Sequence, residues 1–244
     1  MNKCLILMGL LLVSQSLFGQ THVFEFGLGV KYDHFKVKQT EDVFDNNFDM
    51  GAMAYVSYGR PINEKLNWQV GLSTNNYKLN FKVMGPEGII YSSRELVSVM
   101  RSNRLYLNLE HTTKQISPKL KWVNGAGISL LIGTKNPYDV ILQRGTEIST
   151  PNGPQSIQIN IQTYGKTGSA IMIGAGTKLY YQVNKDFRIF THLGFITSTG
   201  ELTKVEVNYV EGSSSNYKKA IFTTNGFAPY FNFGIQYTWL KDVK

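Results

Sequence analysis

The side chains best suited to chemistry are few in this chain, and they are poorly grouped. Asp33 and His34 are adjacent, and a histidine beside a carboxylate is able to activate a serine nucleophile. The serines that a loop would bring to the same region are Ser92, Ser93 and Ser102. Nothing in their spacing supports such a group beyond proximity. We therefore expect no catalytic residue and keep an enzyme only as the alternative interpretation.

Metal and cofactor sites are equally poorly supported. The four histidines share no metal-ligand spacing, and the single cysteine, Cys4, precedes an apolar run at the N-terminus. Three Gly-x-Gly pairs begin at Gly27, Gly125 and Gly174, but each lacks the third glycine and the following helix of a dinucleotide loop. We expect no metal ligand, no cofactor-binding residue and no cofactor.

The elements that position these side chains are predicted to be strands. In residues 230–239, Phe231, Phe233, Ile235, Tyr237 and Trp239 alternate with polar residues and glycine, which is the period of a β-strand. The same pattern occurs in residues 23–33, 49–60, 66–82, 103–111, 121–133, 169–183 and 187–197. Most of these segments have the length of a tilted membrane strand, about 9–11 residues, rather than the 5–6 typical of globular strands.

The connections between these segments alternate in length. Short connections are predicted at residues 61–65, 112–120 and 184–186, and long ones at 34–48, 83–102, 134–168 and 198–226. Within the two last loops, residues 156–163 and 203–209 alternate as well, which indicates hairpins beyond the membrane. The fold class is therefore all-β: a transmembrane, up-and-down antiparallel β-barrel of about eight strands, with short periplasmic turns and long extracellular loops.

The apolar face of each strand decides between a membrane barrel and a soluble carrier barrel, which would turn its large apolar residues inward. The polar faces also hold most of the strand glycines, which suits a narrow interior where Tyr55, Tyr106 and Phe190 pack across. Aromatic residues gather at strand ends, as in an interfacial girdle. Charged residues make up only 17% of the chain, against about 25% in soluble domains. These features favour lipid outside and glycine inside.

Inward-facing charges follow from that orientation. Glu25, Lys178 and Arg188 lie on the inner faces, where an isolated charge is costly. We expect Glu25 to form an ion pair with Lys178 or Arg188 across non-adjacent strands, as in a plugged lumen. The alternative is that each charge reaches trapped water separately. His192 also faces inward and is expected to be hydrogen-bonded rather than a metal ligand.

The N-terminus predicts export. A lysine at position 3, an apolar run over residues 4–13 and small or polar residues to position 20 have the layout of a secretory signal peptide. The run is too short to span a bilayer as a helix. We expect a signal peptide at residues 1–19, although cleavage after Ser16 fits the small-residue rule better, and a single barrel domain at residues 20–244.

Two sequence motifs resemble those of known outer-membrane proteins. Asn232-x-Gly234-x-x-Tyr237-x-Trp239 resembles the terminal-strand signal that the outer-membrane assembly machinery recognises, although residues 240–244 follow it. Residues 105–110 and 122–131 are similar to the fourth and fifth strands of the porin-like outer-membrane β-barrel domain family. This resemblance implies a barrel of about eight strands and no shared ligand or reaction.

The expected function follows from location more than from chemistry. We predict a non-catalytic protein of the outer membrane that is structural or binds through its loops at the cell surface. The alternatives are a barrel enzyme acting on lipid A or peptides and a narrow porin-like channel. Expected partners are outer-membrane lipid and lipopolysaccharide, the assembly machinery through the last strand, and a possible extracellular ligand, with no nucleic acid.

The turns are predicted to form a basic periplasmic rim. Lysine and arginine outnumber the acidic residues there, among which we place Glu64, Glu110, Asp186 and Asp242. Such a rim would contact anionic phospholipid headgroups. Its charge is equally well explained as solubilising the turns.

Overall fold

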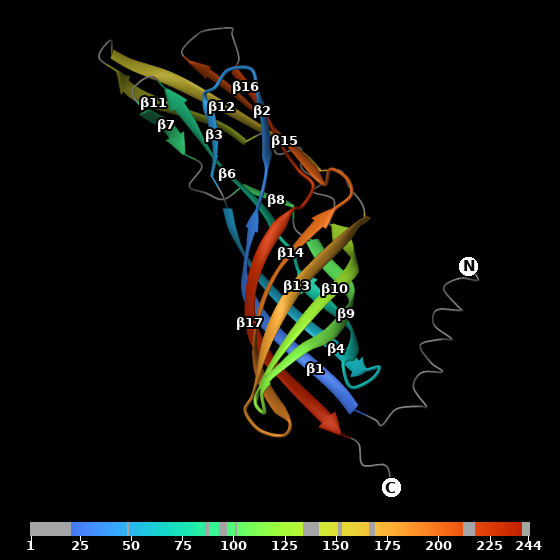
Figure 1. The fold of residues 1–244 in the computed structure, drawn as a ribbon. Helices are drawn as coiled ribbons and strands as arrows, with labels where there is room; N and C mark the ends of the chain where they lie inside the picture. The colour runs from blue at the N-terminus through green and yellow to red at the C-terminus, as the bar shows by residue number, and fades with distance from the viewer. Residues whose placement is uncertain are drawn as a thin grey trace, which may run out of the picture.

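A closed antiparallel barrel forms the body of the computed structural model (Figure 1). The structure describes residues 21–47, 49–85, 88–92, 97–100, 102–133, 142–150, 153–165, 169–211 and 218–240, so the predicted signal peptide lies outside them. The barrel strands in chain order are β1 (Thr21–Asp33), β4 (Asp49–Pro61), β5 (Leu66–Thr74), β9 (Ser102–Ser117), β10 (Leu120–Gly133), β13 (Ser169–Gln182), β14 (Phe187–Ser198) and β17 (Ala228–Leu240). Each strand pairs with the next, and β17 pairs with β1 to close the ring. The predicted eight-stranded up-and-down barrel is confirmed.

The register puts apolar residues side by side on the outside of the barrel. Where β1 meets β17, Phe26 lies opposite Ile235 and Leu28 lies opposite Phe233, and all four side chains are exposed. Similar exposed residues cover the other barrel strands, for example Ile128, Ile171 and Leu193. A continuous apolar surface of this size is not found on soluble monomers. The exterior therefore requires a lipid environment.

The strand predicted at residues 66–82 is wrong as a single element. It divides into β5, which ends at Thr74 in the barrel wall, and β6 (Tyr77–Gly85), which belongs to a separate sheet. Between them, the buried Asn75 donates its N–H to the carbonyl of Ser102 at 2.9 Å and its Nδ2 to the Tyr77 hydroxyl at 2.9 Å. These bonds end the barrel strand and start the new one. At the opposite end of the barrel, the neighbouring strand β9 runs to Ser117, so the turn predicted at residues 112–120 is shorter than expected.

The long connections fold into two further sheets beyond one end of the barrel (Figure 1). One sheet has the order β11-β12-β15-β16-β2, with bounds Leu142–Thr150, Gly153–Gly165, Thr203–Glu211, Lys218–Thr224 and Lys36–Gln39. The other has the order β3-β6-β7, with β8 also paired to β6; their bounds are Phe44–Asn47, Tyr77–Gly85, Gly88–Ser92 and Val97–Met100. We call these two sheets the cap. The hairpins predicted in the two last loops are confirmed.

The cap has its own hydrophobic core. The core draws from both sheets: Leu79, Phe81 and Val83 of β6, Phe44 of β3, Val205, Val207 and Tyr209 of β15, and Ala220 and Phe222 of β16, together with Phe35. The ring of Phe222 lies 5.5 Å from that of Phe81 and contacts Phe44 edge-on. The two sheets therefore pack face to face, as in a small sandwich.

Short breaks join the barrel strands to the cap strands. At the break between β16 and β17, Gly226 has a φ of 73°, and a Cβ there would lie 2.8 Å from the Tyr77 hydroxyl. Two hydrogen bonds hold the neighbouring breaks together: the Thr224 hydroxyl donates to the His34 carbonyl at 2.7 Å, and the Ser198 N–H to the Asn225 carbonyl at 2.9 Å. The cap thus continues the barrel wall through hydrogen-bonded joints.

Candidate functional site

The lumen contains a buried ion cluster in which one lysine serves two carboxylates. Lys178 of β13 places its Nζ 2.6 Å from Glu25 Oε2 and 2.6 Å from Glu110 Oε1. Glu25 comes from β1 and Glu110 from β9, so three non-adjacent strands meet at one cation. All three side chains are almost completely buried. The expected pair of Glu25 with Lys178 is confirmed.

Neutral hydrogen-bonding groups surround the two carboxylates of this cluster. Glu25 Oε1 accepts from the Tyr180 hydroxyl at 2.5 Å and from Gln236 Nε2 at 2.7 Å. Glu110 Oε2 accepts from Gln69 Nε2 at 3.0 Å. Buried charges are tolerated when their remaining lone pairs are occupied in this way. The carboxylates of the cluster therefore have hydrogen-bond partners inside the closed lumen.

Arg188, the alternative ion-pair partner expected for Glu25, is linked to that carboxylate indirectly. Its Nη1 donates to Gln236 Oε1 at 2.8 Å, and Gln236 in turn binds Glu25, so the arginine reaches the carboxylate through an amide. Glu110, which we placed on the periplasmic rim, is instead 3% exposed inside the barrel. Side chains alternate along β9, so the outward Leu109 predicts that its neighbour Glu110 faces the lumen.

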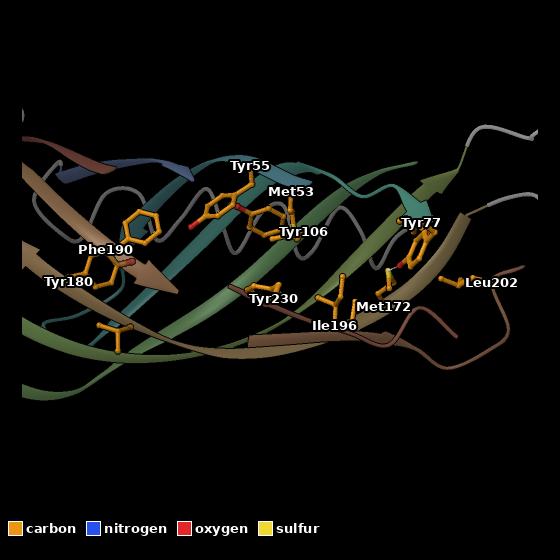
Figure 2. Packing of buried hydrophobic residues seen from close by; sticks show 13 residues of the cluster. Met53, Tyr55, Tyr77, Tyr106, Met172, Tyr180, Phe190, Ile196, Leu202 and Tyr230 are labelled. Carbon is orange, nitrogen blue, oxygen red and sulfur yellow. Dashed lines mark hydrogen bonds between the residues drawn. The ribbon is translucent and has the colours of Figure 1, made fainter. Parts of the chain in front are cut away.

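Aromatic rings fill the lumen along its length (Figure 2). Tyr55 lies between Tyr106 and Phe190, with ring centroids 6.2 Å and 6.3 Å away. The glycines opposite leave the necessary room: a Cβ at Gly71 would lie 2.6 Å from Tyr106, and one at Gly234 would lie 2.7 Å from Phe190. The predicted packing of large rings against strand glycines is confirmed, and the barrel body is plugged by its own side chains.

The residues considered for catalysis are engaged in structural contacts. Asp33 is buried and forms an ion pair with Lys31. Ser102 is buried, and its hydroxyl donates to the carbonyl of Asn75. The side chain of Ser92 and all of Ser93 lie outside the described residues. The described part of the chain thus brings no serine hydroxyl to His34.

The outer face of the five-stranded cap sheet carries a charged patch. Glu206 of β15 accepts hydrogen bonds from Lys204 at 2.5 Å and from Lys219 at 2.6 Å. These bonds hold the pKa of the Glu206 carboxyl below its usual value. Lys36 and Lys38 of β2 are exposed beside it. Over β2, β15 and β16, this face therefore carries more lysine than carboxylate among the described side chains.

Two further features are absent from the described residues. No group of three or more histidine, cysteine, aspartate or glutamate side chains is arranged to hold a metal ion among these residues. The same residues include no helix with the length and apolar character needed to cross a membrane.

Comparisons with known proteins identify the fold. No known family and no curated protein matches the chain. Among solved structures, the outer membrane protein OprG from Pseudomonas aeruginosa aligns with a TM-score of 0.53 at 10% identity, over 91% of this chain and 97% of that one. Neisserial surface protein A (NspA) gives 0.45 at 10% identity over 89% and 96%, and the outer membrane protease OmpT from Escherichia coli gives 0.42 at 10% over 93% and 100%.

The closed ring of eight strands and its apolar exterior together define an outer-membrane β-barrel protein. The similarity to OprG supports this fold independently of the apolar exterior. The fold is therefore that of a small outer-membrane barrel, which is the fold that the resemblance of its strand motifs implied. It differs from a bare barrel in having its long loops folded into the two-sheet cap.

Proposed function

We propose that this protein is a non-catalytic outer-membrane barrel whose cap binds a ligand or partner at the cell surface. The observation that carries the proposal is the cap's own hydrophobic core, which draws on three of the four long loops. The strands of the remaining loop, β11 and β12, join the cap by pairing with β15. Binding residues are commonly presented on loops held by a rigid scaffold. A cap of two packed sheets extends that scaffold beyond the membrane surface.

Basic side chains on the cap indicate the chemistry of such a ligand. Lys36 and Lys38 are exposed at the edge of the sheet, next to the patch formed by Lys204, Glu206 and Lys219. A surface with more lysine than carboxylate attracts acidic groups. Acidic polysaccharide, including the anionic core of lipopolysaccharide, is therefore the ligand class that we propose.

Two further partners, membrane lipid and the assembly machinery, are expected for any barrel of the outer membrane. Membrane lipid surrounds the apolar exterior, and the assembly machinery would recognise β17. In that strand, Tyr237 and Trp239 face outward at the end near the chain terminus, and Gly234 lies against Phe190 in the lumen. The residues of the assembly motif thus also complete the wall and its packing.

A truncation of the cap tests the proposed function. Residues 134–168 and 198–226 would be replaced by short turns, and the barrel would be reconstituted in nanodiscs. We expect binding to immobilised acidic polysaccharide by the full protein and none by the truncated one. Both should retain the heat-dependent gel shift of a folded barrel. Equal binding by the two proteins would contradict the proposal.

The alternatives make opposite predictions in two further measurements. A barrel enzyme would change the lipid A or peptide profile of cells that produce the full protein, and we expect no change. A narrow channel would give steady single-channel currents in planar bilayers, and we expect none, because Tyr55, Tyr106 and Phe190 fill the lumen.

A further inference from the structure

Arg104 is a buried cation with no carboxylate partner among the described residues. It lies on β9, is 7% exposed, and donates from Nε to the Ser73 hydroxyl at 3.1 Å. Its guanidinium lies 5.5 Å from the centre of the Tyr106 ring. None of the ion pairs between described residues includes it. Arginine is seldom buried in this way without a counter-charge.

Three other lumen cations lie close to carboxylates, directly or through one amide. Lys178 lies between Glu25 and Glu110, and Lys31 pairs with Asp33. Arg188 is linked to Glu25 through Gln236. Counted over these groups, the charges of Lys31, Lys178, Arg188 and Arg104 exceed those of Glu25, Glu110 and Asp33 by one. Among these groups, Arg104 carries the positive charge that no carboxylate balances.

A cavity of about 30 Å³ lies beside Arg104, and its lining includes His192, Tyr230, Asn108 and Ser129. Glu110 and its ion-pair partner Lys178 line the same cavity, so the carboxylate there already has a cation. The Tyr230 hydroxyl and His192 Nε2 are hydrogen-bonded at 3.0 Å, whereas His192 Nδ1 has no partner among the described residues. If the tyrosine donates to Nε2, the neutral imidazole carries its proton on Nδ1. His192, which lines the same cavity as Arg104, then has a free N–H donor among the described residues.

We propose that this cavity binds one chloride ion between the Arg104 guanidinium and His192 Nδ1–H. A water needs roughly 10–15 Å³ of such space, so the cavity holds one monatomic ion or about two waters. Carboxylates and phosphate are too large for it. The ion supplies the counter-charge of Arg104 and satisfies the free imidazole donor. The ion then balances the excess positive charge of the groups counted above.

Bromide is the probe for this site because it replaces chloride and scatters anomalously. Crystals of the full protein grown in sodium bromide should show an anomalous peak within hydrogen-bond distance of Arg104 and His192. The peak should be absent in Arg104→Gln and present in Arg60→Gln, whose arginine lies at the turn end of β4. Density for water without anomalous signal in the wild-type protein would overturn the proposal.

Stability provides a test that does not depend on the variant folding. At constant ionic strength, replacing 300 mM gluconate by chloride should raise the folded-to-unfolded ratio of the wild-type barrel in detergent. For a dissociation constant of about 30 mM, the increase is about tenfold. A ratio that is the same in both salts would count against the bound ion. If Arg104→Gln folds, its ratio should not depend on chloride.

Discussion

Lys178 is the residue on which the charge balance of the lumen depends most. Its single positive charge is shared by Glu25 and Glu110, at 2.6 Å from each, in a place where neither carboxylate has access to bulk water. Removing one partner of a buried ion pair costs far more stability than replacing both partners by apolar residues, because the other charge stays buried without a partner. The cost of losing Lys178 is therefore expected to be large.

The substitution Lys178→Met should destabilise the barrel by about 3–5 kcal/mol, because it leaves two buried carboxylates without their cation. The measurement is the free energy of unfolding in urea, with the protein reconstituted in lipid vesicles. Lys185→Met, in an exposed turn, is the matched control and should behave as wild type. Adding Glu25→Gln and Glu110→Gln to Lys178→Met should restore part of the loss. An unchanged urea midpoint for Lys178→Met would show that the cluster contributes nothing.

The sequence predicted part of this cluster and missed part of it. Alternation along the strands puts Glu25 and Lys178 on the inner face, and the cost of isolated charge predicts that they pair. Glu110 follows the same alternation, but its place near the end of the predicted strand suggested the rim. The strand continues to Ser117, so Glu110 is well inside the wall. Strand boundaries are the hardest feature to predict from a sequence, because both the barrel wall and the turn tolerate polar residues there.

At the level of elements, the main difference from the sequence prediction is the cap. Along β5 the apolar side chains occupy even positions, such as Trp68, Val70 and Leu72, and point to lipid. Along β6 they occupy odd positions, such as Tyr77, Leu79 and Phe81, and are buried in protein. Both segments alternate with a period of two, so the alternation by itself predicts one long strand. The switch of parity marks the point where the chain leaves the membrane.

The substitution Phe222→Ala should unfold the cap while leaving the barrel intact. Phe222 is completely buried between the two cap sheets, and loss of such a ring costs about 3–5 kcal/mol. Limited proteolysis should cut the variant within residues 134–168 or 198–226, and the gel shift of the folded barrel should remain. Ile221→Ala, on the opposite face of β16, is the control and should resist cleavage. Loss of the gel shift in Phe222→Ala would show that cap and barrel unfold as one unit.

At the scale of the whole molecule, the barrel has an apolar surface and the cap has a polar one. The barrel turns its apolar residues outward and keeps charge and glycine inside, while the cap buries apolar residues and exposes lysine. Each arrangement suits only one medium, lipid for the first and water for the second. The boundary between them lies at the short joints around Asn75, Ser198 and Gly226, which fixes how far the protein projects from the bilayer (Figure 1).

The orientation of the barrel faces is tested most directly by spin labels placed one at a time along residues 126–131 of β10 in lipid vesicles. Oxygen, which concentrates in lipid, should collide most often with labels at Ala126, Ile128 and Leu130, where the native side chains are exposed. Labels at Ser129 and Leu131 should be protected, because these positions face the filled lumen. A reversed pattern, or access of a water-soluble nickel complex to Ile128 and Leu130, would contradict the membrane-embedded barrel.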